Sequence, residues 1–266
     1  NTLLAIANTD LENQEEKVFT LSFVPQEFGY INAHLSIDDY PVVFDDTYYL
    51  SLYIAPQINV LEIYSQAPDP SLELLFADDS LFTYTSNAML RVDIQRFNDY
   101  KLILAPLDNR MSEGLRAGLE DYVNAGGSLL LYPANDAQIP PQGILNELKI
   151  NIQPLPDTVA TRINDMLESH PFFDEMFNKI PENADLPSVR KHYRLVPGPG
   201  SYNLISLLNG NPFLTYNKAG QGSVFHLASP LEASASGFTA SSLFPSSLIR
   251  MAFYGLAQNK LSYTLG

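Results

Sequence analysis

Four polar side chains lie where apolar stretches of the sequence end: Gln66, Asp108, Asn135 and Asp136. If the apolar stretches are parallel strands, these side chains share the carboxyl edge of one sheet, where open α/β sheets bind their ligands. Amide and carboxylate groups at such an edge can bind a sugar or another small polar molecule. The four residues therefore form the candidate crevice, and the pattern assigns no catalytic role to any of them.

The sequence indicates neither a metal site nor a cofactor site. Acidic doublets occur at residues 38–39, 45–46 and 78–79, but none belongs to a D-x-[DN]-x-[DN]-G loop. Calcium needs about six to eight oxygen ligands, so turn formation and solubility explain these doublets better. No G-x-G-x-x-G follows the first apolar stretch, and Pro68 and Pro70 lack the amide hydrogens that would hold a phosphate.

The histidines are interpreted as structural. His226 lies inside an apolar stretch and is expected to be a strand histidine with a backbone partner, and His34 is expected to be solvated. His170, before a proline, is expected to cap a turn. His192 belongs to the basic cluster Arg190–Arg194, which could bind an anion or an acidic partner but is more often a solvated face.

The stretch that must position the candidate crevice runs from Tyr100 to Asn135 and predicts a strand–helix–strand unit. Both strands are short apolar runs, typical of parallel strands buried on both faces. Between them, Ser112 can cap a helix whose apolar residues recur at helical spacing, and Gly126 follows where a helix needs a positive φ to end.

Similar patterns predict the rest of an α/β domain over residues 58–266. Strands are expected at 58–64, 202–208, 213–216 and 223–228, with a short extended piece at 151–155. Helices are expected at 71–79, with Ser71 as N-cap, at 142–148, at 161–167 and from Pro245 onward. Residues 1–57 have alternating β patterns at 17–23, 30–37 and 47–54, with another strand at 3–7. They predict a partial immunoglobulin-like β-sandwich.

Composition excludes several functions. The 266 residues include 45% hydrophobic side chains, enough for a sizeable core, and the net charge is −15. This acidity argues against nucleic acid and against anionic lipid as partners. There is no cysteine, which excludes disulfides, thiolate metal sites and a cysteine nucleophile. Because the chain begins at Asn1 with no leader-like segment, we expect that a membrane anchor lies outside it.

The order of these elements resembles the BatA-type, membrane-anchored proteins of bacterial aerotolerance operons. The resemblance is carried by residues 43–52, 59–61, 100–107, 119–133, 170–173, 210–214, 220–224 and 227–231. It implies an α/β domain with a mostly parallel, flavodoxin-like sheet similar to class I glutamine amidotransferases, after an immunoglobulin-like region. It also implies a location on the periplasmic side of the bacterial inner membrane and protein partners at that membrane.

The amidotransferase likeness lacks its nucleophile. In those enzymes the strand corresponding to Ser128–Tyr132 leads to a cysteine, whereas here Pro133, Ala134 and Asn135 follow. Covalent amide transfer therefore has no nucleophile. The sequence predicts a non-catalytic interaction or scaffold module. The alternative is a carbohydrate-related or other small-molecule-binding enzyme of the similar ThuA-like group.

Overall fold

The computed structural model describes residues 5–6, 18, 20–23, 29–37, 46–54, 57–77, 81–135, 150–174 and 186–254. They belong to two compact units, one of which contains the residues up to 56 while the other spans Gln57–Ala257. The boundary that the sequence predicts, between residues 57 and 58, lies next to this division.

The described part of the first unit contains one antiparallel pair of strands, β1 (Gly29–Ser36) and β2 (Thr47–Ile54). Their register places Ile31 opposite Leu52 and Ala33 opposite Leu50, so the alternation in the sequence becomes one apolar face. The structure assigns no strand to residues 18 and 20–23, where the sequence predicts one. The predicted strand at 3–7 lies mostly outside the described residues.

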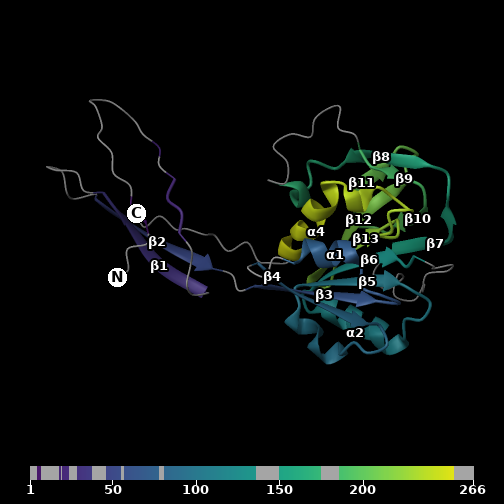
Figure 1. The fold of residues 1–266 in the computed structure, drawn as a ribbon, viewed down its shortest axis with the longest axis horizontal. Coiled ribbons are helices and arrows are strands. Elements are labelled where there is room, and N and C mark those ends of the chain that lie inside the picture. Colours follow the sequence, from purple (N-terminus) through teal and green to yellow (C-terminus); the bar gives the residue numbers. More distant parts are fainter. Residues whose placement is uncertain are drawn as a thin grey trace. The chain divides into compact units, whose positions relative to one another are not determined.

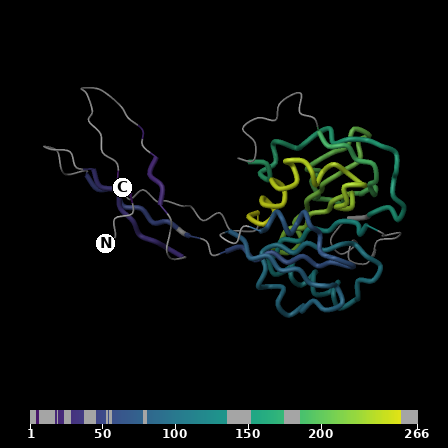
Figure 2. Tube along the Cα trace, in the orientation of Figure 1, coloured from purple at the N-terminus to yellow at the C-terminus, as the bar shows by residue number. Residues whose placement is uncertain are grey.

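The second unit is built on a nine-stranded sheet with the order β4-β3-β5-β6-β13-β12-β11-β8-β9. Its strands are β3 (Ile58–Tyr64), β4 (Phe82–Ala88), β5 (Leu102–Leu107), β6 (Ser128–Pro133), β8 (Thr161–Met166), β9 (Ser188–Val189), β11 (Ser201–Leu207), β12 (Pro212–Ala219) and β13 (Gly222–Leu227). A separate antiparallel pair joins β7 (Ile150–Asp157) to β10 (His192–Pro197). Figure 2 shows that the earlier residues of this unit form one half and the later residues the other.

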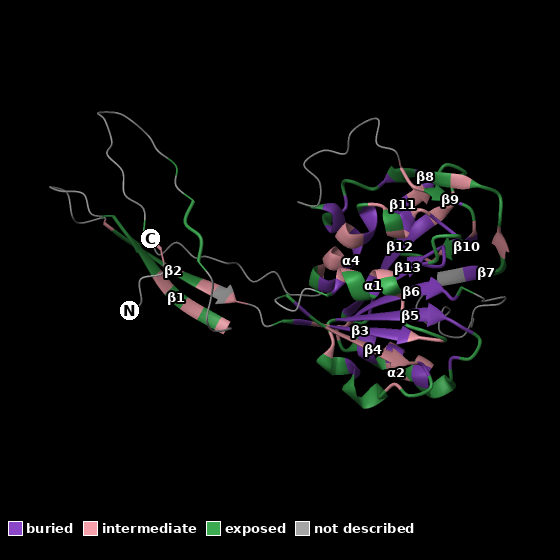
Figure 3. Ribbon diagram, in the orientation of Figure 1, coloured by how far each residue is buried: buried purple, intermediate pink, exposed green. Residues whose placement is uncertain are grey.

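One half of the sheet is parallel. The strands β4, β3, β5, β6 and β13 are parallel neighbours, and in chain order they stand second, first, third, fourth and fifth. Every residue of β5, β6 and β13 is buried, as the purple strands in Figure 3 show. The α/β class, with a large sheet built around parallel strands, is therefore confirmed, although four of the eight strand pairings are antiparallel.

Helices cover both faces of the parallel strands. Helices α1 (Pro70–Leu75) and α4 (Leu243–Tyr254) lie on one side and α2 (Glu113–Asn124) on the other (Figure 1). Short 3-10 helices are η1 (Ile94–Asp99), η2 (Pro171–Phe173) and η3 (Phe238–Ala240). As predicted, Ser112 caps α2 by accepting from the Leu115 amide at 3.2 Å, and Gly126 adopts a φ of 109° after it.

The other half of the sheet is antiparallel, from β13 through β12, β11 and β8 to β9. Two further predictions are wrong. Residues 161–166 form β8 instead of a helix, because pairing with β11 outweighs local propensity. The N-cap of α1 is Asp69, not Ser71, because Pro70 already occupies the first turn. The predicted helix at 142–148 lies outside the described residues.

Candidate functional site

The carboxyl ends of β3, β5, β6 and β13 lie side by side because these strands are parallel neighbours. Gln66 follows β3, Asp108 follows β5 directly, and Asn135 follows β6. The sequence therefore placed these three residues on one edge of the sheet. Asp136 lies outside the described residues, so the structure does not locate it.

Asp108 is buried, with 2% of its surface exposed, and Arg110 donates hydrogen bonds to both oxygens of its carboxylate. The Arg110 Nε donates to Oδ1 at 2.9 Å and to Oδ2 at 3.0 Å, and a terminal nitrogen donates to Oδ2 at 2.5 Å. The Arg110 backbone amide also donates to Oδ1 at 2.8 Å. The residue therefore forms a charge-assisted, forked pair within its own turn.

The electrostatics of Asp108 follow from this geometry. Burial raises the pKa of its carboxyl, but the Arg110 guanidinium and the adjacent Ser65 hydroxyl outweigh burial and lower the pKa to about 2. Asp108 is therefore ionised at neutral pH, and its oxygens are already engaged. A pKa of about 2 makes this carboxylate a weak base at neutral pH.

Gln66 and Asn135 are exposed, and neither side chain belongs to a buried polar cluster. The Asn135 carbonyl accepts from the Lys191 Nζ at 3.1 Å, and the Lys191 carbonyl accepts from the Ser229 hydroxyl at 2.8 Å. Lys191 thus ties the end of β6 to the corner after β13. These contacts fix the backbone of the edge and leave the two amide side chains at the surface.

The sequence analysis missed a second buried acid, Glu62, in the interior of β3. Its Oε1 accepts from the Asp69 amide at 2.8 Å, and its Oε2 accepts from the Tyr84 hydroxyl. Burial raises the pKa of Glu62, although both donors act to lower it. The available signal was a lone acid in an otherwise apolar strand, since a strand buried on both faces rarely contains an unpaired charge.

Tyr132, at the end of β6, lies close enough to Glu62 for the two groups to influence each other. Burial raises the pKa of the Tyr132 phenol, and the charges of Glu62 and Asp69 add to that effect. The buried Glu62 is thus hydrogen-bonded to the partly buried Tyr84 and interacts electrostatically with the buried Tyr132. Through the Asp69 amide, Glu62 also ties β3 to the loop that leads into α1.

His226 is fully buried in β13, and neither ring nitrogen has a hydrogen-bond partner in the described chain. The predicted backbone partner is therefore wrong. Burial lowers the pKa of His226 to about 3, so the ring is neutral in the fold. Directly opposite on β12, the buried Thr215 hydroxyl also lacks a partner. Two isolated neutral groups provide neither a nucleophile–base pair nor a charge.

The remaining histidines are structural or exposed. His170 accepts from the Phe172 amide at 3.2 Å and caps η2, as predicted. His34 is exposed, also as predicted. His192 is buried, and its Nε2 lies 4.0 Å from the Asp157 Oδ2. The expectation of a solvated basic face is therefore wrong at this residue, although Arg190 and Arg194 are exposed.

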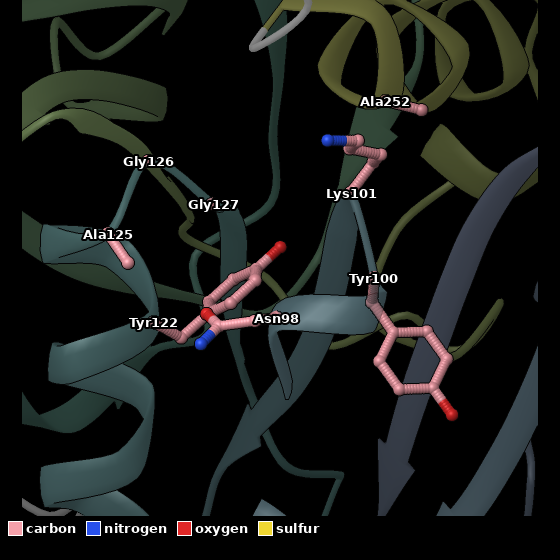
Figure 4. Close-up of a pocket in the computed structure, with 8 residues that line it drawn as sticks. All are labelled: Asn98, Tyr100, Lys101, Tyr122, Ala125, Gly126, Gly127 and Ala252. Atoms are coloured by element: carbon pink, nitrogen blue, oxygen red, sulfur yellow. The ribbon is translucent and has the colours of Figure 1, made fainter. Parts of the chain in front are cut away.

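A pocket of about 170 Å³ lies at the opposite, amino-terminal edge of β5 and β6. It is lined by Asn98, Tyr100, Lys101, Tyr122, Ala125, Gly126, Gly127 and Ala252. In Figure 4 the Lys101 amino group extends toward the side where Gly126 and Gly127 lie, while the Tyr100 ring extends the other way. The Tyr122 hydroxyl donates to the Ser128 carbonyl at 3.0 Å. The lining contains one cation, Lys101, and no carboxylate.

The described residues contain neither a candidate metal site nor a candidate membrane span. No group of three or more His, Cys, Asp or Glu side chains there is placed to hold a metal ion. None of the helices in that part of the chain has the length and apolar character needed to cross a bilayer.

No protein-family model matches the sequence, and no curated protein matches it. Solved structures are similar in fold. A cytoplasmic protein of Salmonella typhimurium matches with a TM-score of 0.55 and 12% identity, over 85% of this chain and 95% of that chain. The mmIFT52 N-terminal domain matches with a TM-score of 0.54 and 12% identity, over 77% of this chain and 100% of that one.

A third similar structure is a β-galactosidase of Bacillus circulans, with a TM-score of 0.51 and 14% identity. The match covers 77% of this chain but only 31% of the β-galactosidase, so it concerns one part of a larger protein. At these identities the likeness shows a shared fold and nothing about activity.

Proposed function

We propose that this chain is a non-catalytic protein-interaction or scaffold module. The observation that supports this most is the state of Asp108, the buried acid at the strand ends of the candidate crevice. Its oxygens are engaged by Arg110, and its pKa is lowered to about 2. The turn after β6 offers Pro133, Ala134 and Asn135, none of which is a nucleophile.

The setting we propose is the periplasmic side of a bacterial inner membrane, in a protein anchored by segments outside this chain. The resemblance to BatA-type proteins supports it. The order of the parallel strands supports a flavodoxin-like, amidotransferase-like domain, since that fold has the order second, first, third, fourth, fifth. The apolar face of the β1–β2 pair supports an immunoglobulin-like first region, because such a pair needs a second layer to bury that face.

A site-specific photo-crosslinker tests the interaction role. Placed at Gln66, on the carboxyl edge, it should capture one reproducible protein partner in intact cells. Placed at Asn98, another exposed residue but near the amino edge, it should not. Equal capture from both positions, or capture from neither, would contradict a partner at the carboxyl edge.

The alternative is binding of a carbohydrate or another small molecule. It is favoured by the exposed amides of Gln66 and Asn135 on neighbouring strand ends and by the fold shared with part of a β-galactosidase. A ligand that binds only the folded protein must raise its melting temperature. Thermal shift with galactose, lactose and a panel of other sugars should show such a rise, and the rise should be absent in Gln66→Ala with Asn135→Ala. No shift with any sugar would exclude this alternative for the panel.

A further inference from the structure

The two edges of the nine-stranded sheet differ in how they are protected. At one end the edge strand is β9, which has only two residues and so offers few backbone groups to which another strand could bond. At the other end β4 has seven residues and pairs with β3 in an unbroken register from Ile58–Phe82 to Tyr64–Ala88. Within the described chain no strand pairs with the outer side of β4.

β4 also lacks the devices that keep edge strands from pairing. Natural edges are blunted by lysines, prolines, bulges or inward-pointing charges. The sequence Phe82–Ala88 (FTYTSNA) has no charge, no proline and no bulge, and its first four residues are aromatic or β-branched. Exposed leucines stand near both ends, Leu81 at 52% and Leu90 at 86% exposure. Such an edge is suited to receive another strand.

The backbone directions on β4 are set by two hydrogen bonds at its ends. The Leu81 carbonyl accepts from Ile58 at 2.9 Å, and the Met89 amide donates to Tyr64 at 2.8 Å. Odd-numbered residues therefore direct their backbone groups toward β3. The even-numbered residues direct theirs outward, because successive residues of a strand alternate.

We propose that β4 pairs with β4 of a second copy of this chain, antiparallel and about a two-fold axis at Thr85. This register pairs Phe82 with Ala88, Thr83 with Asn87, Tyr84 with Ser86 and Thr85 with its own copy. The outward-pointing even residues then face each other as hydrogen-bonded pairs, and Thr85 forms the non-hydrogen-bonded pair on the axis. No other centre of pairing aligns all seven residues.

The side chains of this register are complementary. The rings of Phe82 and Tyr84 pack on Phe76 of their own chain, and the residues paired with them, Ala88 and Ser86, are small enough to leave that packing undisturbed. Threonine meets threonine at the axis. No pair brings like charges together, which matters in a chain of net charge −15. A contact between two copies of one patch is the form that two-fold dimers take. The inference stands independently of the function proposed above, since a binding protein or an enzyme could pair in the same way.

Single cysteines test the register, because the chain has no cysteine of its own. Across the axis the two Thr85 Cα atoms would be about 4.5 Å apart, within disulfide reach, whereas two Thr83 Cα atoms would be about 14 Å apart. Thr83 is the matched control, since it lies on the same strand and points to the same face. Under mild oxidation, Thr85→Cys should give a covalent dimer at least about tenfold faster than Thr83→Cys. Equal rates, or no dimer from either, would overturn the register.

Sedimentation of the unmodified chain tests the dimer itself. The dimer fraction should rise with concentration and with salt, because salt screens the repulsion between two acidic chains. Ser86→Pro should lower it at least about tenfold while preserving the fold, since the Ser86 amide points away from β3 and proline is tolerated on an edge. A monomer at all concentrations and salts, or a dimer unchanged in Ser86→Pro, would refute the proposal.

Discussion

The buried acids on or after β3 and β5 differ in their partners from the buried neutral groups on β13 and β12. Asp108 and Glu62 each have donors to both carboxylate oxygens. His226 on β13 and Thr215 on β12 stand opposite each other in the sheet interior with no hydrogen-bond partner in the described chain. An unpaired buried charge costs far more than an unpaired neutral group. The fold therefore supplies partners where charge would otherwise be buried and tolerates isolation where the group is neutral.

The first prediction concerns the strand that both halves share. Gly222 begins β13, and a Cβ there would overlap the carbonyl oxygens of Gly127 and Val123, which are backbone atoms and cannot turn aside. Gly222→Ala should therefore lower the free energy of unfolding by about 3 kcal/mol. Urea denaturation measures the loss. Gly114→Ala is the control, since nothing lies near its added Cβ, and it should not destabilise. Similar stability in both variants would show that the halves are not packed tightly at this strand.

The second prediction removes the partner of the charged group. Arg110→Ala removes the only charged partner described for the buried Asp108 carboxylate and should lower the free energy of unfolding by about 2 kcal/mol. The expected loss is smaller than for a fully buried pair because the Arg110 side chain is 46% exposed. Arg96→Ala breaks an exposed pair with Asp99, so it should cost less than about 0.5 kcal/mol. Equal losses in the two variants would remove the distinction between the edge and the surface.

The pH dependence of the same pair has a defined sign. Folding lowers the Asp108 pKa from 3.8 to about 2, so its contribution to stability is present above pH 3.8 and is lost as pH falls toward 2. In Arg110→Ala the carboxyl should titrate at higher pH, because its main stabilising charge is gone. NMR titration of the Asp108 carboxyl measures this shift directly, and an unchanged pKa would contradict the assignment.

The third prediction concerns Glu62, whose environment acts in the opposite direction. Tyr84→Phe removes one donor from a buried carboxyl and should cost about 1.5 kcal/mol. Folding raises the pKa of Glu62 above 4.5. The contribution of this shift to the free energy of unfolding is therefore fully present below pH 4.5 and is lost as the pH rises through the pKa that Glu62 has in the folded protein. Glu62→Gln should remove that decline. Urea midpoints between about pH 4 and pH 8 test both effects, and identical profiles for wild type and Glu62→Gln would contradict them.

The elements that position the edge could be predicted from the sequence because their signals are local. The α2 cap at Ser112, the positive φ at Gly126 and the buried strands on either side were all confirmed. The predicted helix at 161–167 was wrong because β8 is defined by a non-local strand, β11. The local sequence pattern of residues 161–167 does not show that this segment will be stabilised by pairing with β11.

The edge on which the strand-end residues lie could be predicted from the sequence, but their contacts could not. Strand ends placed Gln66, Asp108 and Asn135 on one edge, yet nothing in the pattern showed that Arg110 would engage Asp108. Glu62 was overlooked because its donors, Tyr84 and the Asp69 amide, come from elements distant in the sequence or from a loop. Partners across strands depend on register, which a single sequence does not contain.

The smallest effect is expected in the antiparallel interior. Thr215→Val replaces a hydroxyl without a partner by a methyl group of similar shape and should raise the free energy of unfolding by about 1 kcal/mol. His226 has a folded pKa of about 3, below its ordinary 6.5, so the unfolded chain binds the proton first and stability falls as pH drops below 6.5. His226→Leu should flatten that decline in urea midpoints between about pH 7 and pH 4. If Thr215→Val instead destabilises the protein, the hydroxyl has a partner such as a bound water, and the interior would then satisfy its polar groups as the carboxyl edge does.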